Sequence, residues 1–245
     1  MSCRHARSVT TARSICSRLN GRSISTKAAG SRTVSDLKSR YKVVIYDCDG
    51  VILDSIESNY IFYNLVMEYL GRAPLDRNDL DARRVLHTYS FNNVMEYFFA
   101  GDDRREEAFR FAKTIHYRDL MPYMRMEDGF VAALDRLKGN TALAICTNRA
   151  TSMEMIIEDF GLTGYFECVM TASQVANPKP HPEPLLKVLE HFGAAPEEAL
   201  FIGDGEVDML AAKGAGIPFI SYKSHLPALA CIQHHSEIVR HVFME

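Results

Sequence analysis

Five short apolar runs, separated by longer segments with helical spacing, constrain the fold of this 245-residue chain more than any other feature. Each run is short enough for a buried strand and is flanked by polar or turn residues. The runs cover residues 42–47, 141–147, 166–171, 199–204 and 217–222. The helical patterns cover roughly residues 129–138, 150–160, 182–192 and 206–213. Because strands that alternate with helices form parallel sheets covered on both faces, the pattern predicts an α/β fold.

One interval breaks this alternation. Residues 56–126 contain no convincing strand but several amphipathic stretches with helical spacing. They predict an all-helical insert over residues 57–126, between two parts of an α/β core made of residues 41–56 and 127–245. We expect most of its large apolar side chains to form the insert's own core. These are Phe62, Met67, Tyr69, Met95, Tyr97, Phe98, Phe109 and Phe111.

Residues 1–40 have a different composition from the rest of the chain. They hold nine Lys or Arg residues and one acidic residue, are rich in serine, and lack a continuous apolar stretch. This composition is typical of an organellar transit peptide, but since composition alone does not establish one, a disordered basic tail or a start-site error is favoured. We therefore predict a cytoplasmic protein, or an organellar one if residues 1–40 are a transit peptide.

The remaining residues exclude several classes of partner. They carry 19 basic and 30 acidic residues, which argues against nucleic acid as the main partner. No apolar stretch approaches the roughly 20 residues that span a bilayer, so we expect a soluble protein with no membrane partner. The six cysteines lack the CxxC spacing of a zinc site or a disulfide framework, which favours reduced thiols. The sequence leaves monomer and homodimer open.

Polar residues follow the apolar runs at the points where strands should end. Ligands of a parallel α/β sheet bind outside the carboxyl ends of its strands. Each of these residues comes directly after a run that should be buried, or in the loop behind one, so surface solvation does not explain the set. The predicted site consists of Asp47, Asp49, Thr147, Asn148, Lys179, Asp204 and Asp208.

The acidic members of this set predict a cation site. Asp47, Asp49 and Asp204 would bring three carboxyl groups together, and a hard divalent cation relieves their repulsion. Mg²⁺ suits such a site best, because it needs only one or two carboxylates and leaves room for a phosphate oxygen. Asp208, four residues after Asp204, can support the ion directly or through water. A calcium loop is excluded because Gly50 stands at the fourth position of the segment rather than the sixth.

The other members of the set are donors. The Thr147 hydroxyl, the backbone N–H of Asn148 and the charge of Lys179 can hold a phosphoryl group and neutralise its equatorial oxygens. A phosphate held between these donors and a metal ion would face a carboxylate that can attack it. The residues therefore predict phosphoryl-transfer chemistry.

Taken together, four segments resemble the motifs of the haloacid dehalogenase (HAD) superfamily, in its phosphoglycolate phosphatase and β-phosphoglucomutase-like branch. They come in the family's order and, with the insert, account for nearly everything from Lys42 to about Tyr222. The segments are DCDGVILDS at 47–55, AICTN at 144–148, PKPHPEP at 178–184 and GDGEVDMLAA at 203–212. The combination is specific, whereas each motif alone would be weak.

The resemblance implies a Rossmann-like three-layer core with a type 1 all-helical cap that closes over the site. It implies that Asp47 is the nucleophile and forms an aspartyl-phosphate. Asp49 would protonate the leaving alkoxide and then activate the hydrolytic water. Mg²⁺ would be held by the side chains of Asp47 and Asp204 and the backbone carbonyl of Asp49, with Asp208 in support. The phosphate-binding residues would be Thr147, Asn148 and Lys179, with Lys179 also restraining Asp47.

The predicted function is a Mg²⁺-dependent phosphomonoesterase that hydrolyses a small phosphorylated metabolite, either phosphoglycolate-like or a sugar phosphate. Dehalogenase members lack an acid at the position of Asp49, which favours phosphoester chemistry here. A phosphosugar mutase of the β-phosphoglucomutase type is the alternative, because cap residues decide between the two. A non-catalytic binding protein is disfavoured by the intact Asp47, Asp49, Lys179 and Asp204.

Other residues receive structural predictions. Asp54, with Ser55, is expected to cap the first helix of the insert. His87 lies beside apolar residues and is expected to be packed. The remaining charges of the insert are expected to be solvated, as helix-surface charges usually are. They include Arg83, Arg84 and Lys113.

Overall fold

The computed structural model describes residues 38–244. The predictions for residues 1–37, as a presequence or basic tail, lie outside the described residues. The two ends of the described chain lie side by side, because Ser39 forms an antiparallel bridge with Phe243. The N–H of Arg40 also donates to the carbonyl of Val242 at 2.7 Å. No helix between residues 38 and 244 is long and apolar enough to cross a bilayer.

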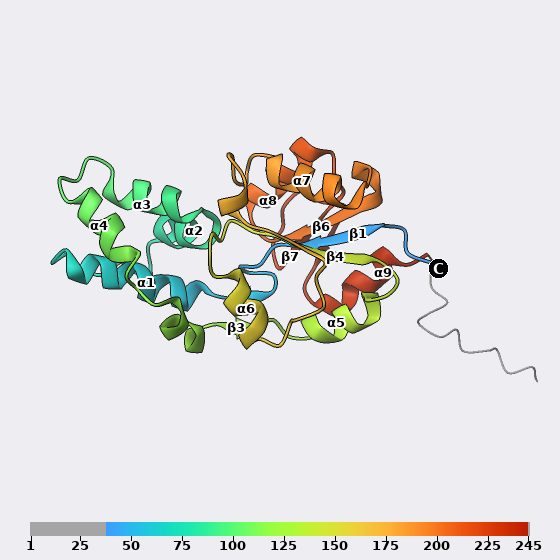
Figure 1. Cartoon of the computed structure of the whole chain (residues 1–245), viewed down its shortest axis with the longest axis horizontal. Coiled ribbons are helices and arrows are strands. Elements are labelled where there is room, and N and C mark those ends of the chain that lie inside the picture. The colour runs from blue at the N-terminus through green and yellow to red at the C-terminus, as the bar shows by residue number, and fades with distance from the viewer. Residues whose placement is uncertain (1–37, 245) are drawn as a thin grey trace, which may run out of the picture. The chain divides into compact units, whose positions relative to one another are not determined.

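A six-stranded parallel sheet forms the centre of the fold, in the order β5-β4-β1-β6-β7-β8 (Figure 1). Five strands lie within the predicted runs, which confirms the parallel α/β prediction. They are β1 (Val43–Tyr46), β4 (Ala142–Cys146), β5 (Cys168–Met170), β6 (Ala199–Gly203) and β7 (Phe219–Tyr222). The edge strand β8 (Ala230–Ile232) was not predicted, because it is short and only one of its three residues is buried.

Helices cover both faces of the sheet. Because side chains of a strand alternate between faces, Val43 and Ile45 of β1 point to one face and Val44 and Tyr46 to the other. The first face packs against α7 (Glu183–Phe192) and α8 (Glu206–Ala215). The second packs against α5 (Phe130–Leu137), α6 (Met153–Asp159) and α9 (Ile238–Val242). Figure 1 shows α7 and α8 above the sheet and α5 and α9 below it.

The helix α7 illustrates how sequence spacing produces this packing. Leu185, Val188 and Leu189 are buried against the sheet and share one face of the helix. Each buried aliphatic side chain of this size contributes about 1.5–3 kcal/mol. The helix ends at Gly193, whose φ of 55° is left-handed and therefore favours glycine. Amphipathic spacing thus holds α7 against the sheet, and the glycine ends the helix.

The insert is helical, as expected, and has a hydrophobic cluster of its own. Its elements are α1 (Ile56–Tyr69), α2 (Leu80–Thr88), α3 (Phe91–Phe99), α4 (Arg105–Ala112) and the 3-10 helix η2 (Tyr117–Tyr123). The helix α2 lies within the predicted helical insert, although its bounds were not predicted from the sequence. Its start is fixed by Asp79, whose carboxylate accepts from the N–H groups of Asp81 and Ala82 at 2.9 and 3.0 Å.

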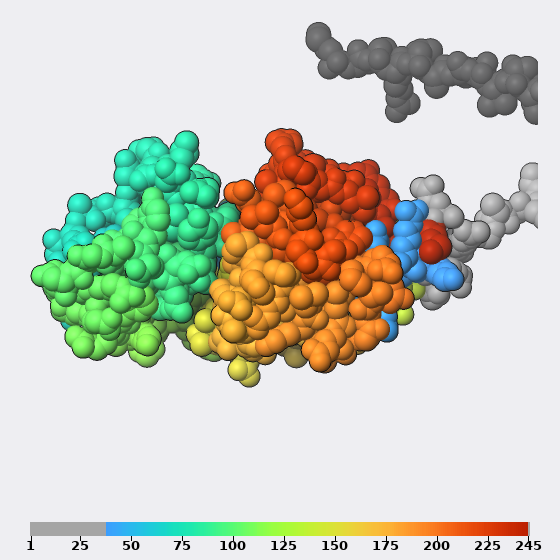
Figure 2. All heavy atoms as spheres, turned by 90° about the horizontal axis from the view of Figure 1, so that it is seen from above, coloured from blue at the N-terminus to red at the C-terminus, as the bar shows by residue number. Residues whose placement is uncertain are grey.

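The insert is joined to the α/β part by a two-stranded antiparallel sheet that was not predicted. In it β2 (Leu53–Asp54), just before α1, pairs with β3 (Arg125–Met126), just after η2. Residues at the end of the insert, including Leu120 and Met121, pack into the hydrophobic cluster on the α5 side of the sheet. Figure 2 shows the insert, in cyan and green, against the later segments in orange and red. The domain limits at residues 57 and 126 remain a prediction.

Candidate active site

A cavity of about 410 Å³ lies between the carboxyl ends of the strands and the insert. Asp47 follows β1, Thr147 follows β4 and Asp204 follows β6. All of the site residues predicted from the sequence line this cavity: Asp47, Asp49, Thr147, Asn148, Lys179, Asp204 and Asp208. We call the strand-end side of the cavity, with these residues, the floor, and the side formed by the insert the roof.

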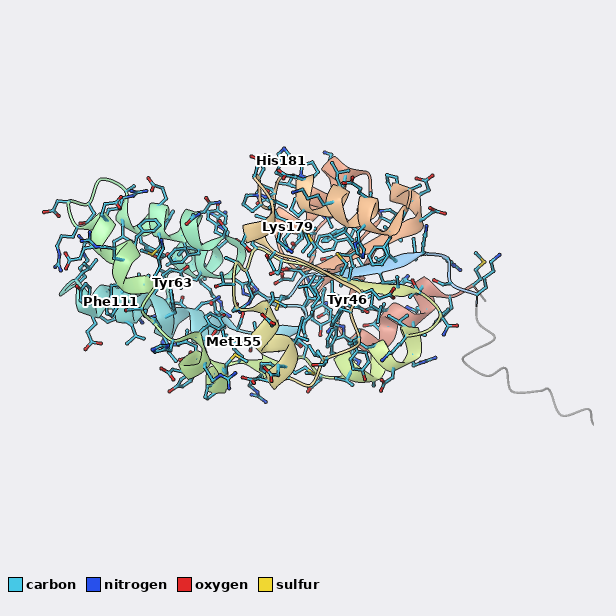
Figure 3. All side chains as sticks on the ribbon, viewed as in Figure 1. Tyr46, Tyr63, Phe111, Met155, Lys179 and His181 are labelled. Carbon is cyan, nitrogen blue, oxygen red and sulfur yellow. The ribbon has the colours of Figure 1, made fainter. Side chains whose placement is uncertain are left out.

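Lys179 is the central cation of the floor. Its Nζ donates to Asp47 Oδ1 at 2.7 Å, to Asp208 Oδ1 at 2.6 Å and to the carbonyl oxygen of Cys146 at 3.0 Å. The side chain is almost fully buried, and Figure 3 labels it beside the sheet. Burial alone would lower the pKa of Lys179, but the charges of Asp208 and Asp47 outweigh it and raise this pKa. Lys179 is therefore charged and holds Asp47 in place.

Three carboxylates of the floor are arranged to share a cation. One oxygen from each of Asp47, Asp204 and Asp208 lies within 4.8 Å of the others. Burial, together with the negative charge of Asp208, raises the pKa of Asp47 well above its usual value. Both oxygens of Asp208 are already engaged, one by Lys179 and the other by the N–H of Gly205 at 3.1 Å. Asp47 and Asp204 are therefore the ligands best placed to meet an ion.

Gly50 allows the loop after β1 to approach Asp204. Its φ of 75° is left-handed, which side chains rarely adopt. A Cβ at this position would also collide with Asp204 Oδ2 and would lie 2.6 Å from Nε2 of His87. The close approach of the first motif to the fourth therefore requires glycine.

Asp49 has a partner that the sequence analysis missed. Arg149 Nε donates to Asp49 Oδ2 at 2.7 Å, and its Nη2 donates to Oδ1 at 2.5 Å. Burial alone would raise the pKa of Asp49, but Arg149 outweighs this effect and lowers it. The signal for Arg149 was its position, because it continues the polar sequence that follows β4. Its N–H also donates to Thr147 Oγ1 at 3.1 Å.

The prediction for Ser55 was wrong in part. Ser55 stands at the N-cap of α1, but its side chain makes no capping hydrogen bond. Its hydroxyl donates instead to Asp49 Oδ1, which draws it away from the helix. Asp54 accepts from the N–H of Ile56 at 3.4 Å, a long contact at an exposed position. Ser55 therefore belongs to the surroundings of Asp49.

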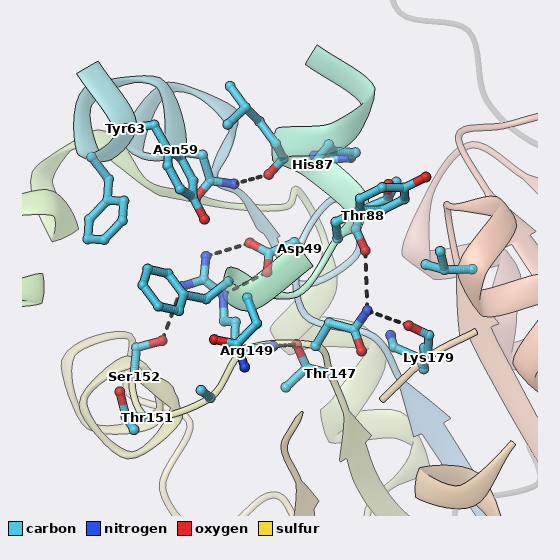
Figure 4. Close-up of a pocket in the computed structure, with 18 of the residues that line it drawn as sticks. Asp49, Asn59, Tyr63, His87, Thr88, Thr147, Arg149, Thr151, Ser152 and Lys179 are labelled. Atoms are coloured by element: carbon cyan, nitrogen blue, oxygen red, sulfur yellow. Dashed lines mark hydrogen bonds and ion pairs between the residues drawn. The ribbon is translucent and has the colours of Figure 1, made fainter. Parts of the chain in front are cut away.

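Residues at the end of α2 connect the roof to the floor by two hydrogen bonds, of which Figure 4 marks the one between Thr88 and Asn148. His87 was expected to be packed, but its Nε2 lies 2.6 Å from Asp204 Oδ2. Burial would lower the pKa of His87, yet the bond and charge of Asp204 raise it to about 9. The side-chain amide of Asn148 donates to the carbonyl oxygens of Lys179 at 3.0 Å and Thr88 at 3.3 Å. A single sequence could not reveal either pairing.

The roof is mainly apolar and aromatic. Most of the insert's large side chains pack in its cluster, as expected, but several also face the cavity. The apolar and aromatic roof residues are Phe62, Tyr63, Leu86, Tyr89, Phe91, Ile115 and Tyr117. Lys113, for which no role was expected, lines the cavity as well.

Comparison with known proteins gives consistent matches. The sequence model of a family described as haloacid dehalogenase-like hydrolase matches residues 44–222. A phosphoglycolate phosphatase of Thiobacillus denitrificans is 31% identical over 189 residues, which cover 72% of this chain and 81% of that protein. A phosphoglycolate phosphatase of Aquifex aeolicus is 27% identical over 187 residues, covering 71% of this chain and 81% of its own.

Solved structures resemble the chain as well. A HAD-superfamily hydrolase, subfamily IA, of Geobacter sulfurreducens has 55% identity and a TM-score of 0.69, covering 82% of this chain and 96% of that one. A β-phosphoglucomutase of Clostridium difficile has 18% identity and a TM-score of 0.69, covering 82% of this chain and 96% of its own. At that identity the second likeness shows the fold alone.

Proposed function

Since the chain belongs to the haloacid dehalogenase-like hydrolase family, we propose that it is a Mg²⁺-dependent phosphomonoesterase of small phosphorylated metabolites. Its family and its phosphoglycolate phosphatase relatives make it a phosphatase. The observation that carries the finer proposal is the position of Asp47, which is held by Lys179 at 2.7 Å beside Asp204 at the sheet edge. Phosphoglycolate-like compounds and sugar phosphates are the substrates to test first.

Asp47 is the proposed nucleophile. One oxygen of its carboxylate accepts from Lys179, so the other oxygen can attack phosphorus. The new bond joins Asp47 to phosphorus as the ester P–O bond breaks, and the leaving oxygen takes a proton. Water then attacks the aspartyl-phosphate and releases inorganic phosphate. Lys179 and the Thr147 hydroxyl, with the N–H of Asn148, are the proposed phosphoryl donors.

Asp49 is the proposed acid and base. Its pair with Arg149 favours the ionised carboxylate, which suits the second step, in which Asp49 removes a proton from water. The first step needs the protonated acid, so Asp49 must gain a proton when substrate changes its pairing with Arg149. We propose that Arg149 and Ser55 together orient Asp49 toward the leaving oxygen.

The residues present fit Mg²⁺. Asp47 and Asp204 offer hard oxygen ligands, and a cation would offset both the burial and the neighbouring charge of Asp208 that raise the pKa of Asp47. The backbone carbonyl of Asp49 is the third proposed ligand, and Asp208 supports the site through Lys179. When bound, Mg²⁺ supplies positive charge that draws the phosphate toward Asp47 and offsets the repulsion between the carboxylates.

The proposal is tested by measuring inorganic phosphate released from a panel of phosphomonoesters, with Mg²⁺ and with excess chelator. We expect turnover that chelation abolishes and Mg²⁺ restores. Full activity in excess chelator would contradict the metal assignment, and no turnover of any ester would contradict the function. An isomerised sugar phosphate as the product, with no phosphate release, would identify a mutase instead.

The insert is the proposed cap, because it covers the cavity and holds the roof residues. Since closing a site over its substrate excludes water, movement of the insert would protect the aspartyl-phosphate until the hydrolytic water is in place. A cytoplasmic location stays our proposal, with an organelle as the alternative if residues 1–40 are a transit peptide. Monomer and homodimer both remain open.

A further inference from the structure

The roof of the cavity has a chemistry that the proposed function does not use. Phe62 and Phe91 meet edge to face, with ring centroids 6.2 Å apart, and Phe62 meets Tyr63 in the same way at 4.9 Å. Phe62 and Phe91 are half-buried, whereas Val66 and Met95 in the insert's cluster are fully buried. The two phenylalanine rings therefore present apolar surface to the cavity in addition to packing in the insert.

The apolar wall extends down to the acid that serves the leaving group. The Arg149 guanidinium, which holds Asp49, lies 5.3 Å from the centroid of the Tyr117 ring. The leaving oxygen of a phosphoester must reach Asp49. The carbon atoms attached to that oxygen would therefore lie beside the aromatic side chains of the roof, starting near Tyr117. Figure 4 shows Asp49, Arg149 and Tyr63 gathered on this side of the pocket.

The cations of the cavity leave little charge for a second anionic group on the substrate. Lys179 is paired with Asp47 and Asp208, Arg149 with Asp49, and His87 with Asp204. Among residues 38–244, Lys113 is the lining cation with no ion pair, and it is exposed at the edge. A carboxylate placed under the rings would lose hydration without gaining a partner there.

The polar groups that the roof offers to a sugar are the hydroxyls of Tyr63, Tyr89 and Tyr117, the amides of Asn59 and Asn92, and the Thr88 hydroxyl, which already donates to the carbonyl of Arg84 at 2.8 Å. The side-chain amide of Asn59 already donates to the carbonyl of Leu86 at 2.8 Å, and Asn92 is exposed. Unpaired substrate hydroxyls in such a site are penalised. The cavity volume of about 410 Å³ lies in the range of about 300–1,000 Å³ that holds drug-sized ligands, far more than a phosphoryl group and two carbons need.

We propose that the substrate is a phosphomonoester whose leaving group carries an aromatic ring or an apolar body of similar size, bound against Phe62, Phe91 and Tyr117. This inference rests on the proposed phosphomonoesterase chemistry, and it replaces phosphoglycolate-like compounds and sugar phosphates with larger apolar esters as the preferred substrates. The rings select the leaving group by apolar contact, and the floor acts on the phosphoryl group whatever that leaving group is.

A matched pair of esters tests the proposal. Ethyl phosphate and 2-phenylethyl phosphate both release a primary alkoxide, so they differ by the ring and not by the chemistry at phosphorus. We expect kcat/KM to be at least about tenfold higher for 2-phenylethyl phosphate, as burial of a ring predicts. We expect 2-phosphoglycolate to be a poorer substrate than 2-phenylethyl phosphate.

Binding without turnover gives a second readout. The non-hydrolysed analogues 2-phenylethylphosphonate and ethylphosphonate are titrated by calorimetry into the full chain with Mg²⁺. We expect the ring to tighten binding by about tenfold or more. If no ester is hydrolysed, the proposed function is wrong, and the phosphonate comparison still decides whether the roof selects rings.

Variants assign the preference to the roof. Phe62→Leu and Phe91→Leu keep an apolar side chain but remove a ring, and each should reduce the phenylethyl-to-ethyl ratio to about threefold or less. Tyr97→Leu is the control, because Tyr97 is an exposed ring on α3 that does not line the cavity. It should leave the ratio unchanged. A ratio of about two or less for the unmodified chain in both assays, or a preference for 2-phosphoglycolate, would overturn the proposal.

Discussion

The floor and the roof of the cavity are built on opposite principles. On the floor, Asp47, Asp49 and Lys179 each lie within hydrogen-bonding distance of an oppositely charged partner. On the roof, Phe62 and Phe91 face the cavity with apolar rings, which offer a substrate contact surface but no charged group. In the proposed function the floor would fix the geometry of the reaction, and the roof would select the shape and polarity of the leaving group. Substitutions should therefore have different consequences on the two sides.

The largest expected effect comes from the proposed nucleophile. Asp47→Asn removes the attacking oxygen's charge but keeps the shape of the side chain, so turnover should fall at least about 1,000-fold while the fold persists. Phosphate release and circular dichroism measure the two outcomes. Asp54→Asn, at an exposed position seven residues on, is the control and should stay active. Residual activity above a few per cent in a folded Asp47→Asn protein contradicts the assignment.

Loss of the central cation should destabilise the floor itself. Lys179→Met leaves two buried carboxylates, Asp47 and Asp208, without their cation, which should cost about 3–5 kcal/mol in the free energy of unfolding. Denaturant titration gives the value. Lys187→Met removes an exposed lysine that pairs with Glu183 on α7 and should change stability by less than about 1 kcal/mol. Equal losses in the two variants would mean that the buried cluster is no more tightly coupled than the surface.

Replacement of Arg149 tests whether the floor positions its acid. Arg149→Met removes both hydrogen bonds from the guanidinium to Asp49, and kcat should fall about 10–100-fold with a smaller change in KM. Arg149→Lys retains the charge without the two-point contact and should recover part of kcat. Arg118→Met, at an exposed arginine of η2, is the control. An unchanged kcat in Arg149→Met would show that Asp49 needs no such support.

The smallest expected effect concerns the contact between roof and floor. Folding raises the pKa of His87 from 6.5 to about 9, so its bond to Asp204 stabilises the fold fully below pH 6.5 and loses this effect as pH rises through about 9. In the presence of chelator, the free energy of unfolding at pH 6 should be about 1–2 kcal/mol higher for the unmodified chain than for His87→Leu. The difference is this small because the pair is partly exposed. The difference should vanish near pH 10. A difference that is independent of pH would mean that packing alone accounts for it.

The sequence predicted the floor of the cavity much better than the roof or the contacts between roof and floor. Strand ends in a parallel sheet share one edge, so polar residues such as Asp47 and Asp204 could be placed together from local patterns alone. The position of Arg149 after β4 was a signal, but the pairings of Arg149 and His87 could not be predicted, because their partners lie 100 and 117 residues away. The bounds of α2 could not be predicted from an apolar stripe, because the capping residue Asp79 defines its start.

The short pairing of β2 with β3 has a mechanical consequence. It pairs the segment that enters the insert with the segment that leaves it. If the insert rotates relative to the α/β part, we expect these two segments to move together, with the strand pair as the pivot. Ser55 follows β2 directly and donates its hydroxyl to Asp49. A rotation of the insert about this pivot would therefore move Ser55 and, through its hydrogen bond, the Asp49 carboxylate, which is the proposed acid and base. We therefore expect the angle of the insert and the position of the Asp49 carboxylate to change together.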